Sequence, residues 1–309
     1  MIVTVTLNTC IDKTVQVRGF AVGATLKGKV LRRRPAGKGI NVSRCLAALG
    51  HRSVAAGFVG RNERLLFSRE IALRGIAELL IEVDGRTRDN ITYIDPDAHT
   101  ETHIREEGFE VTQAGLDQLH SALASIADRG DTVVFSGSMP PGLPDAALAD
   151  LVAASRRQGA SVVVDSNGEP FRLALEARPL LIKPNIAELE ELTGTGCSSP
   201  EQIAASARSL LDRVQTIAVS MGARGAVCVT AGEAWYACGE VAGVQHTVGC
   251  GDALLAGFIA AREEAAPLRE CLREAVACGG ASARCDIASD LRRQDVDSLL
   301  PLVEVKRIA

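Results

Sequence analysis

Short runs of apolar, mostly β-branched residues recur along the chain, and stretches with helical periodicity separate them. Most runs are continuous rather than alternating, which is typical of strands that are covered on both faces. They predict strands over 1–7, 53–60, 131–137, 161–166, 180–184 and 216–220. The stretches between them predict helices over 38–49, 62–74, 112–128, 144–158, 185–193, 200–213, 251–264 and 268–284. Repeated strand–helix units predict an α/β fold, in which a doubly wound, mostly parallel sheet carries helices on both faces.

Two segments depart from this pattern. Residues 13–34 and 88–106 alternate apolar with polar side chains and contain turn signals. Such alternation is typical of hairpin strands with one face in water. We therefore expect a small separate sheet, inserted in a single domain over 1–309 and suited to act as a lid.

Composition narrows the function classes. The 309 residues suit one large α/β domain. A net charge of −4 argues against nucleic-acid binding by the protein as a whole. The nine cysteines are an odd number without a Cys-x-x-Cys pair, which favours reduced thiols. The sequence has neither an apolar run of about 18 residues nor the pattern of a signal peptide, so we expect a cytoplasmic protein that does not interact with a membrane.

The segment HTVGCGDALLAGF (246–258) places a glycine-rich turn before a predicted helix. A turn of Gly249, Cys250 and Gly251 would aim unpaired N–H groups at one point, where the helix dipole also favours an anion. Asp252 follows directly. An aspartate in a first helical turn is either a functional carboxylate or only a helix cap, and this segment alone leaves both interpretations open.

The two standard phosphate loops do not fit the sequence. Arg32 stands where a Walker A motif needs glycine, and Leu254 stands at the third glycine of a dinucleotide fingerprint. Other polar or glycine-rich segments fall at predicted strand ends or helix starts, namely 35–50, 136–144, 183–194 and 220–229. In a doubly wound sheet such segments would converge on one crevice.

Eight segments together carry a family resemblance. In chain order they are LNTCID, GKGINVSRCLAALG, TRDNITYI, TETHIREEG, SGSMPPGLP, KPNIAELEELTG, SMGARGA and HTVGCGDALLAGF. With these segments in this order, the sequence resembles the ribokinase-like PfkB family of carbohydrate kinases over nearly its whole length. Within that family it is similar to the sugar-phosphate kinase branch.

The resemblance implies a ribokinase-like fold and ATP-dependent phosphorylation of a ketohexose phosphate. Fructose 1-phosphate is the first expected acceptor, which would give fructose 1,6-bisphosphate. Tagatose 6-phosphate and fructose 6-phosphate are alternative acceptors. A kinase for an unphosphorylated sugar and a non-catalytic sugar-phosphate sensor are further alternatives, although a pure sensor has no need of a base such as Asp252.

The resemblance also implies roles for individual residues around the reacting groups. Asp252 would be the catalytic base, and the N–H groups of Gly249, Cys250 and Gly251 would form the anion hole. The acceptor sugar would contact Asp12, Gly37, Lys38, Gly39 and Asn41. Its phosphate would contact Arg88, Ser138 and Lys27, although a solvated lid position is the alternative for Lys27. Because a thiol beside a helix N-terminus often has a lowered pKa, we expect the Cys250 thiol to be reactive.

On the nucleotide side, the resemblance assigns ATP contacts to Lys183, Asn185, Ser220, Gly222 and Gly225. Glu188 and Asp165 would face Mg²⁺, with a plain helix-surface charge as the alternative for Glu188. A homodimer formed through the β lid is expected by the same analogy.

Overall fold

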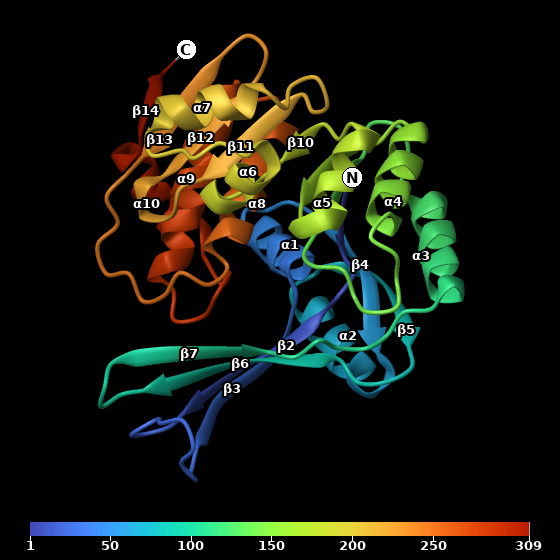
Figure 1. Ribbon diagram of the computed structural model, residues 1–309, viewed down its shortest axis with the longest axis vertical. Helices are drawn as coiled ribbons and strands as arrows, with labels where there is room; N and C mark the ends of the chain where they lie inside the picture. The colour runs from blue at the N-terminus through green and yellow to red at the C-terminus, as the bar shows by residue number, and fades with distance from the viewer. Residues whose placement is uncertain (309) are drawn as a thin grey trace.

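The computed structural model describes residues 1–308 and contains two sheets (Figure 1). The large sheet has ten strands in the order β14 (Glu304–Arg307), β13 (Ala234–Cys238), β12 (Ala226–Val229), β11 (Thr216–Ser220), β10 (Leu181–Ile182), β9 (Ser161–Asp165), β8 (Thr132–Ser136), β1 (Ile2–Thr6), β4 (Ser53–Gly60) and β5 (Ala77–Val83). From β5 through β4, β1, β8, β9 and β10 to β11, neighbouring strands pair in parallel. From β11 through β12 and β13 to β14, they pair antiparallel. The predicted mostly parallel sheet is therefore confirmed.

Four strands escaped the sequence prediction, and all four lie toward the edges of the large sheet. Strand β5 has the sequence AELLIEV, and its residues are mostly exposed or half-buried. Strands β12 to β14 are short and form the antiparallel edge. Strand β5 lacks the continuous apolar run of a buried strand because it lies at the edge of the sheet, whereas β12 (AVCV) is apolar and buried but only four residues long.

Ten helices of the described chain cover the large sheet. They are α1 (Lys38–Ala48), α2 (Arg64–Leu73), α3 (Gln113–Ile126), α4 (Ala147–Arg157), α5 (Gly168–Ala174), α6 (Ile186–Thr193), α7 (Pro200–Arg208), α8 (Cys250–Glu263), α9 (Leu268–Arg284) and α10 (Arg293–Leu299). Short 3₁₀ turns lie at Arg61–Glu63, Leu175–Ala177, Gly222–Arg224 and Leu300–Leu302. The eight predicted helices are present, and α5 and α10, of seven residues each, were not predicted. Within residues 1–308, no helix has both the length and the apolar surface that a bilayer crossing requires.

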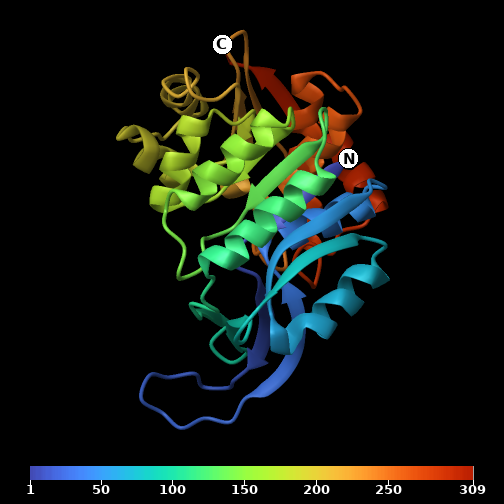
Figure 2. The same cartoon turned by 90° about the vertical axis from the view of Figure 1, so that its right-hand side faces the viewer.

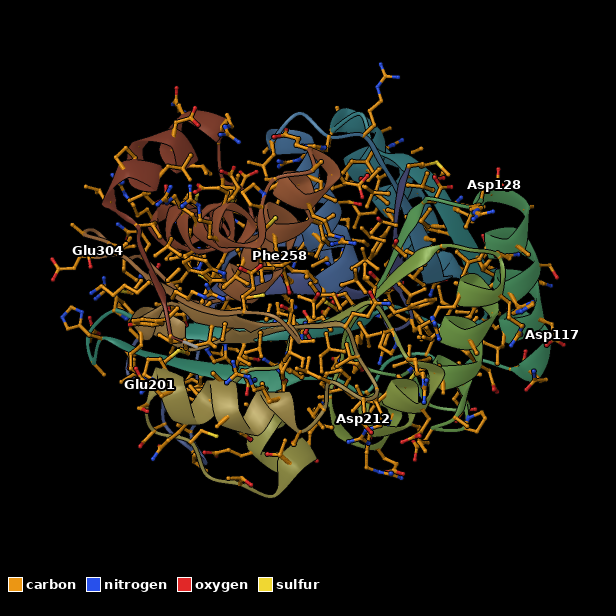
Figure 3. All side chains as sticks on the ribbon, turned by 90° about the horizontal axis from the view of Figure 1, so that it is seen from above. Asp117, Asp128, Glu201, Asp212, Phe258 and Glu304 are labelled. Carbon is orange, nitrogen blue, oxygen red and sulfur yellow. The ribbon has the colours of Figure 1, made fainter. Side chains whose placement is uncertain are left out.

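The core has two main layers, one on each face of the sheet. Consecutive residues of β8 point to opposite layers, because Val133 and Phe135 pack with α3 to α7 and Val134 packs with α1, α8 and α9. Phe258 of α8 is 1% exposed and lies inside the molecule, whereas charged residues such as Asp117 lie at its rim (Figure 3). Helices therefore cover both faces of the sheet, as the continuous apolar strands predict.

The small sheet projects from the body of the molecule (Figures 1 and 2). Its strand order is β3 (Lys29–Ala36), β2 (Cys10–Gln16), β6 (Arg88–Asp95) and β7 (Thr100–Arg105). The strands form two antiparallel hairpins that are joined by parallel pairing of β2 with β6. Both predicted hairpins are present, and the first extends beyond the predicted segment at each end.

Two arginines of β3 tie this sheet to the segment that follows α9. Arg32 donates to the carbonyl of Asp286 at 2.8 Å, and Arg34 donates to the carbonyl of Ala288. Arg34 is 9% exposed, so this attachment lies at the buried base of the sheet. These contacts place the small sheet beside the start of α8 at Cys250 and the end of α9 at Arg284.

Gly57 lets β4 lie against the end of β1. Its φ is 132°, and a Cβ atom at this position would lie 1.9 Å from the carbonyl oxygen of Thr6. Thr6 and Gly57 are register partners in the parallel pair. The close approach of two backbones at the end of β1 therefore requires glycine.

We predict that Gly57→Ala destabilises the protein far more than Gly50→Ala does. Gly50 also has a positive φ, 89°, but apart from Gly50 and its two chain neighbours no atom of residues 1–308 lies within 4 Å of the position that an added methyl group would take there. The control variant should therefore cost about 1–2 kcal/mol of backbone strain. The clash at Gly57 should add overpacking strain and bring the loss above about 3 kcal/mol. Urea unfolding followed by circular dichroism measures both values, and equal losses would contradict the packing argument.

Candidate active site

Asp252 lies buried in the first turn of α8, and only 6% of it is exposed. Helix α8 begins after Gly249, whose φ of 75° is left-handed, and no side chain among residues 1–308 caps the helix. The Asp252 carboxylate instead accepts a hydrogen bond at 2.9 Å from the amide of Asn41 on α1. Asp252 is thus not a helix cap, because its carboxylate is used across the interface between α1 and α8.

Burial raises the pKa of Asp252 to about 6. The ammonium groups of Lys38 and Lys183 and the hydrogen bond from Asn41 act in the opposite direction, and the negative charge of Asp165 acts with burial. A carboxylate with this pKa is ionised at neutral pH and still accepts a proton readily. That combination suits a general base.

Asp165 joins two lysines from different elements. Its side chain is fully buried at the end of β9, with Lys38 Nζ at 3.2 Å and Lys183 Nζ at 3.3 Å from the same carboxylate oxygen. The Ser136 hydroxyl donates to the other oxygen at 3.3 Å. Burial would raise the pKa of Asp165, but the two ammonium groups outweigh it and hold this pKa below its ordinary value. Asp165 is therefore the shared counterion of Lys38 and Lys183.

The ammonium groups of Lys38 and Lys183 lie near the start of α8. Lys183 Nζ is 3.5 Å from the position that a Cβ atom of Gly251 would occupy. The charge of Asp165 raises the pKa of Lys38 despite burial, so its ammonium group is protonated, and 40% of the side chain is exposed. Two ammonium groups and the positive end of the helix dipole together favour an anion at this point.

The thiol of Cys250 differs from the sequence-based expectation. Burial raises its pKa to about 11, the hydrogen bond with Ser282 only partly opposes this, and the Asp252 charge adds to it. The expected lowered pKa is wrong, because desolvation of the thiolate outweighs the favourable helix dipole. The residue contributes its backbone to the turn, and its N–H, one of the three predicted for the anion hole, donates to the Thr247 carbonyl at 3.4 Å.

Two glycines of the predicted sugar site are also packing residues. Gly37 is the N-cap of α1 with φ 141°, and Gly39 follows in the first turn. A Cβ atom at either position would lie 2.6 Å from the side chain of Thr6. The Thr6 hydroxyl in turn accepts the N–H of Ile40 at 3.2 Å. The beginning of α1 therefore packs against the end of β1, which directs Lys38 to Asp165 and Asn41 to Asp252.

Asp12 lies on β2, where it is paired with Arg34 of β3 and with Asn90 of β6. The Asn90 amide donates to Asp12 Oδ1 at 3.4 Å. Asp12 is half-buried at the base of the small sheet. The structure thus places this carboxylate where the small sheet meets the body of the protein.

Arg88 and Ser138, which are 50 residues apart, lie next to each other, and their contact with an acceptor phosphate stays a prediction. Arg88 Nη2 lies 3.5 Å from the Ser138 hydroxyl and donates to the carbonyl of Asn8 at 3.2 Å. Three buried polar atoms beside them lack a partner within residues 1–308, namely Asn8 Oδ1, Arg88 Nε and Asn90 Oδ1. Buried polar groups without partners are uncommon, so this place is suited to a polar ligand.

Sequence reasoning missed Asn8 and Asn90. Both lie inside segments that carried the family resemblance, LNTCID and TRDNITYI, Asn8 four residues before Asp12 and Asn90 two residues after Arg88. Lys27, by contrast, is exposed in the connection between β2 and β3. Its contact with an acceptor phosphate stays a prediction.

Asn185 and Glu188 form a capping box at the start of α6. Asn185 Oδ1 accepts the Glu188 N–H at 3.0 Å, and Glu188 Oε2 accepts the Asn185 N–H at 2.8 Å. Helix capping alone accounts for their spacing. Within residues 1–308, no three carboxylate, imidazole or thiol side chains are grouped closely enough to hold a metal ion. The metal role of Glu188 and Asp165 therefore stays a prediction.

The other predicted nucleotide residues lie on the next strand end. Ser220 ends β11, forms a bridge with Asn185 and donates its N–H to the Pro184 carbonyl at 3.0 Å. A Cβ atom at Gly225 would lie 2.0 Å from the Ala237 carbonyl oxygen, so the following turn needs glycine for packing. Gly222 is open to its surroundings. The ends of β10 and β11 thus bring Lys183, Asn185 and Ser220 to one edge of the sheet.

Comparison with known proteins agrees with this geometry. The model of the pfkB family of carbohydrate kinases matches residues 5–291. The 1-phosphofructokinase of Rhodobacter capsulatus is 37% identical over 278 residues, which cover 89% of this chain and 88% of that protein. The 1-phosphofructokinase of Bacillus subtilis is 34% identical over 310 residues and covers 100% of both chains.

A solved structure shows the same arrangement of elements. The crystal structure of phosphofructokinase-2 from Escherichia coli in complex with potassium superposes with a TM-score of 0.91 at 26% sequence identity. The superposition covers 97% of this chain and 98% of that one.

Proposed function

Because the chain belongs to the pfkB family of carbohydrate kinases, we propose that it transfers the γ-phosphoryl group of ATP to a ketohexose phosphate. The acceptor is fructose 1-phosphate and the product fructose 1,6-bisphosphate. Full-length similarity to a 1-phosphofructokinase supports this choice of acceptor. The observation that carries the proposal is the buried Asp252 carboxylate beside the two ammonium groups at the start of α8.

Asp252 is the general base of the reaction. Its carboxylate takes the proton of the acceptor hydroxyl while the hydroxyl oxygen attacks the γ-phosphorus in line. Asn41 holds Oδ2 of the carboxylate. Since the pKa of Asp252 is about 6, the group is mostly ionised at pH 7 and its conjugate acid is neutral.

Negative charge that develops on the transferred phosphoryl group is stabilised by N–H and ammonium groups that are already in position. The N–H groups of Gly249, Cys250 and Gly251 provide the anion hole at the start of α8, and the Cys250 N–H would exchange the Thr247 carbonyl for a phosphoryl oxygen. Lys38 and Lys183 add two full charges, held in place by Asp165. Groups that are already oriented need no rearrangement during transfer, which is the main contribution of an enzyme to phosphoryl transfer.

The acceptor lies between the small sheet and α8. Its existing phosphate binds Arg88 and Ser138, with Lys27 reaching in from the lid loop, and the unpartnered polar atoms beside Arg88 support this position. A planar guanidinium suits a phosphate because it donates to two oxygens at once. Asp12, Asn41 and the backbone of Gly37 and Gly39 hold the sugar, with the small sheet as a lid.

The nucleotide lies along the ends of β10 and β11, against Lys183, Asn185, Ser220, Gly222 and Gly225. Mg²⁺ bound with it would neutralise phosphate charge. Because the carboxylates are scattered, they fit an ion that keeps water and phosphate ligands better than an ion held by protein ligands alone. Glu188, and more distantly Asp165, would face this ion through water.

A second copy of the chain is proposed to cover the lid. Val30 and Leu31 of β3 and Ile104 of β7 are 54%, 50% and 47% exposed. An apolar sheet face of this kind is commonly an association surface. Light scattering should therefore give about twice the chain mass of 32.5 kDa, and Leu31→Lys with Ile104→Lys should shift the protein toward monomer. A parent protein that is monomeric at all concentrations would refute this dimer.

An ADP-release assay tests the proposed reaction. Turnover should be highest with fructose 1-phosphate, above that with fructose 6-phosphate, tagatose 6-phosphate, fructose or ribose. Preference for an unphosphorylated sugar would redirect the assignment within the family. If none of these sugars supported ATP-dependent turnover, the proposed acceptor class would be refuted.

We predict that Asp252→Asn folds normally and lowers kcat by at least ~10²-fold, because a general base contributes about that much. In the parent enzyme, kcat/KM should fall as the pH drops below about 6, since protonated Asp252 no longer accepts the proton. The matched control Asp117→Asn changes an exposed carboxylate on α3 and should keep the parent kcat. Near-normal turnover of Asp252→Asn would show that Asp252 is not the base.

We also predict that Arg88→Ala raises the KM for the sugar phosphate by about 10- to 100-fold, because it removes charge-assisted hydrogen bonds to the phosphate. The KM for ATP should change by less than about threefold. The control Arg105→Ala removes an exposed arginine of β7 and should leave both values near those of the parent. Equal increases for sugar phosphate and ATP in Arg88→Ala would contradict the assigned role.

A further inference from the structure

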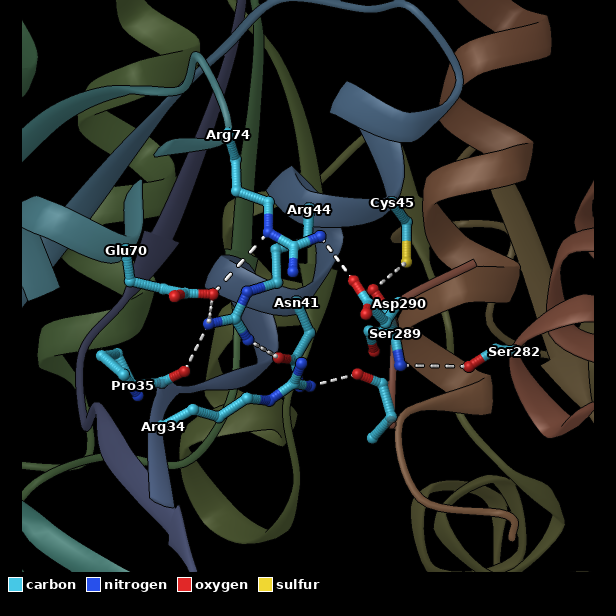
Figure 4. Close-up of polar contacts among 11 residues, drawn as sticks. Arg34, Pro35, Asn41, Arg44, Cys45, Glu70, Arg74, Ser282, Ser289 and Asp290 are labelled. Carbon is cyan, nitrogen blue, oxygen red and sulfur yellow. Dashed lines mark hydrogen bonds and ion pairs between the residues drawn. The ribbon is translucent and has the colours of Figure 1, made fainter. Parts of the chain in front are cut away.

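Arg44 is a buried guanidinium behind Asp252. It lies on α1, only 1% exposed, and is one helical turn after Asn41. Arg44 Nη1 donates to Asn41 Oδ1 at 3.1 Å, and Nη2 donates to Glu70 Oε1 at 3.3 Å and to the Pro35 carbonyl (Figure 4). Asn41 in turn donates to Asp252, so a continuous chain of contacts leads from Arg44 to the reacting carboxylate.

Keeping this charge in the core is unfavourable. Burial lowers the pKa of Arg44 to about 10, Arg34 acts in the same direction, and the carboxylate of Glu70 opposes them. Arg44 is still protonated at neutral pH. Its Nε has no partner within residues 1–308. A buried cation with incomplete partners contributes little to stability by itself, which points to a role in placing other groups.

The chemistry of the two side chains decides how Asn41 is oriented. A guanidinium has only donors, whereas an amide has a carbonyl oxygen on one side and an NH₂ group on the other. Arg44 therefore binds the carbonyl oxygen of Asn41 and leaves its NH₂ group directed at Asp252. With the opposite orientation, the carbonyl oxygen would face the carboxylate and repel it.

The same guanidinium connects this orientation with the small sheet. Pro35 lies near the end of β3, one residue after Arg34, which binds the segment following α9. One side chain thus contacts both the base of the proposed lid and the residue that holds Asp252.

We propose that Arg44 is a positioning residue of the kinase, which fixes the amide orientation of Asn41 and thereby the direction of the Asp252 carboxylate. The proposal rests on the proposed function only for its kinetic consequence. The orientation itself follows from the contacts among Arg44, Asn41 and Asp252.

Titration of Asp252 by ¹³C NMR tests the proposal without substrate. The carboxyl signal is assigned by its absence in Asp252→Asn. Since the Asn41 hydrogen bond lowers the pKa of Asp252, Arg44→Met, which releases Asn41, should raise the titration midpoint by about one pH unit. Arg44→Lys, which keeps a donor and a charge, should raise it less.

The other groups that influence this titration stay in place in the Arg44 variants. Lys38 on α1, Lys183 after β10 and Asp165 on β9 carry the charges that face Asp252, and the thiols of Cys45 and Cys250 lie nearby. Glu70→Gln is the matched control, because it removes the ion pair of Arg44 but leaves the Arg44–Asn41 contact. This control should keep the parent midpoint.

A double-mutant cycle identifies the route of the effect. If Arg44 acts through Asn41, then Arg44→Met combined with Asn41→Leu should shift the midpoint no more than Asn41→Leu alone. Fully additive shifts, or an unchanged midpoint in Arg44→Met, would overturn the proposal. In the kinase assay, Arg44→Met should lower kcat at pH 6.5 by about tenfold with partial recovery at higher pH, while KM changes little.

Neutron diffraction of the parent protein decides the matter if Arg44→Met does not fold. Deuterons on the Asn41 nitrogen that faces Asp252 would support the proposal, and an oxygen in that position would overturn it. If the NMR midpoint shifts as expected but no sugar phosphate is phosphorylated, the proposed function fails and the positioning role stands.

Discussion

The ion cluster that Lys38 and Lys183 form around the buried Asp165 carboxylate holds the candidate site together. The three side chains come from the end of β9, the start of α1 and the end of β10, and both ammonium groups meet one carboxylate oxygen at 3.2 and 3.3 Å. Without that carboxylate, the two ammonium groups would repel each other in a poorly hydrated place. The charges of the cluster, together with burial, determine the pKa of Asp252. The cluster also keeps positive charge beside the first turn of α8.

Several motif residues both pack or cap the backbone and position groups of the candidate site. Gly37 and Gly39 let α1 pack against Thr6, and the same packing directs Lys38 toward Asp165 and Asn41 toward Asp252. Asn185 and Glu188 cap α6 at the edge where the nucleotide is proposed to bind. A motif position is therefore not by itself evidence of ligand contact, because the backbone that presents a ligand group must also be packed.

Both apolar packing and arginines attach the small sheet to the body: Ile11 of β2 is fully buried and packs with Ile40 of α1 and Phe67 of α2. Arg32 and Arg34 bind carbonyl oxygens after α9, and Arg44 binds the carbonyl of Pro35 at the base of β3. The base of the small sheet is therefore fixed to the body by packing and by directional hydrogen bonds, while its strands project from the body (Figure 1).

The sequence by itself determined the layered fold, since continuous apolar runs mark strands covered on both faces, and it placed the glycine-rich turn before Asp252. Short edge strands such as β14 and the short helix α10 carried too few core residues to be recognised. Tertiary structure alone decided the pairing of Asn41 with Asp252, 211 residues away, and of Lys38 with Asp165, 127 residues away. It also reversed the expected shift of the Cys250 pKa. Protonation and side-chain orientation depend on burial and on distant partners, and neither is encoded in the local spacing of residues.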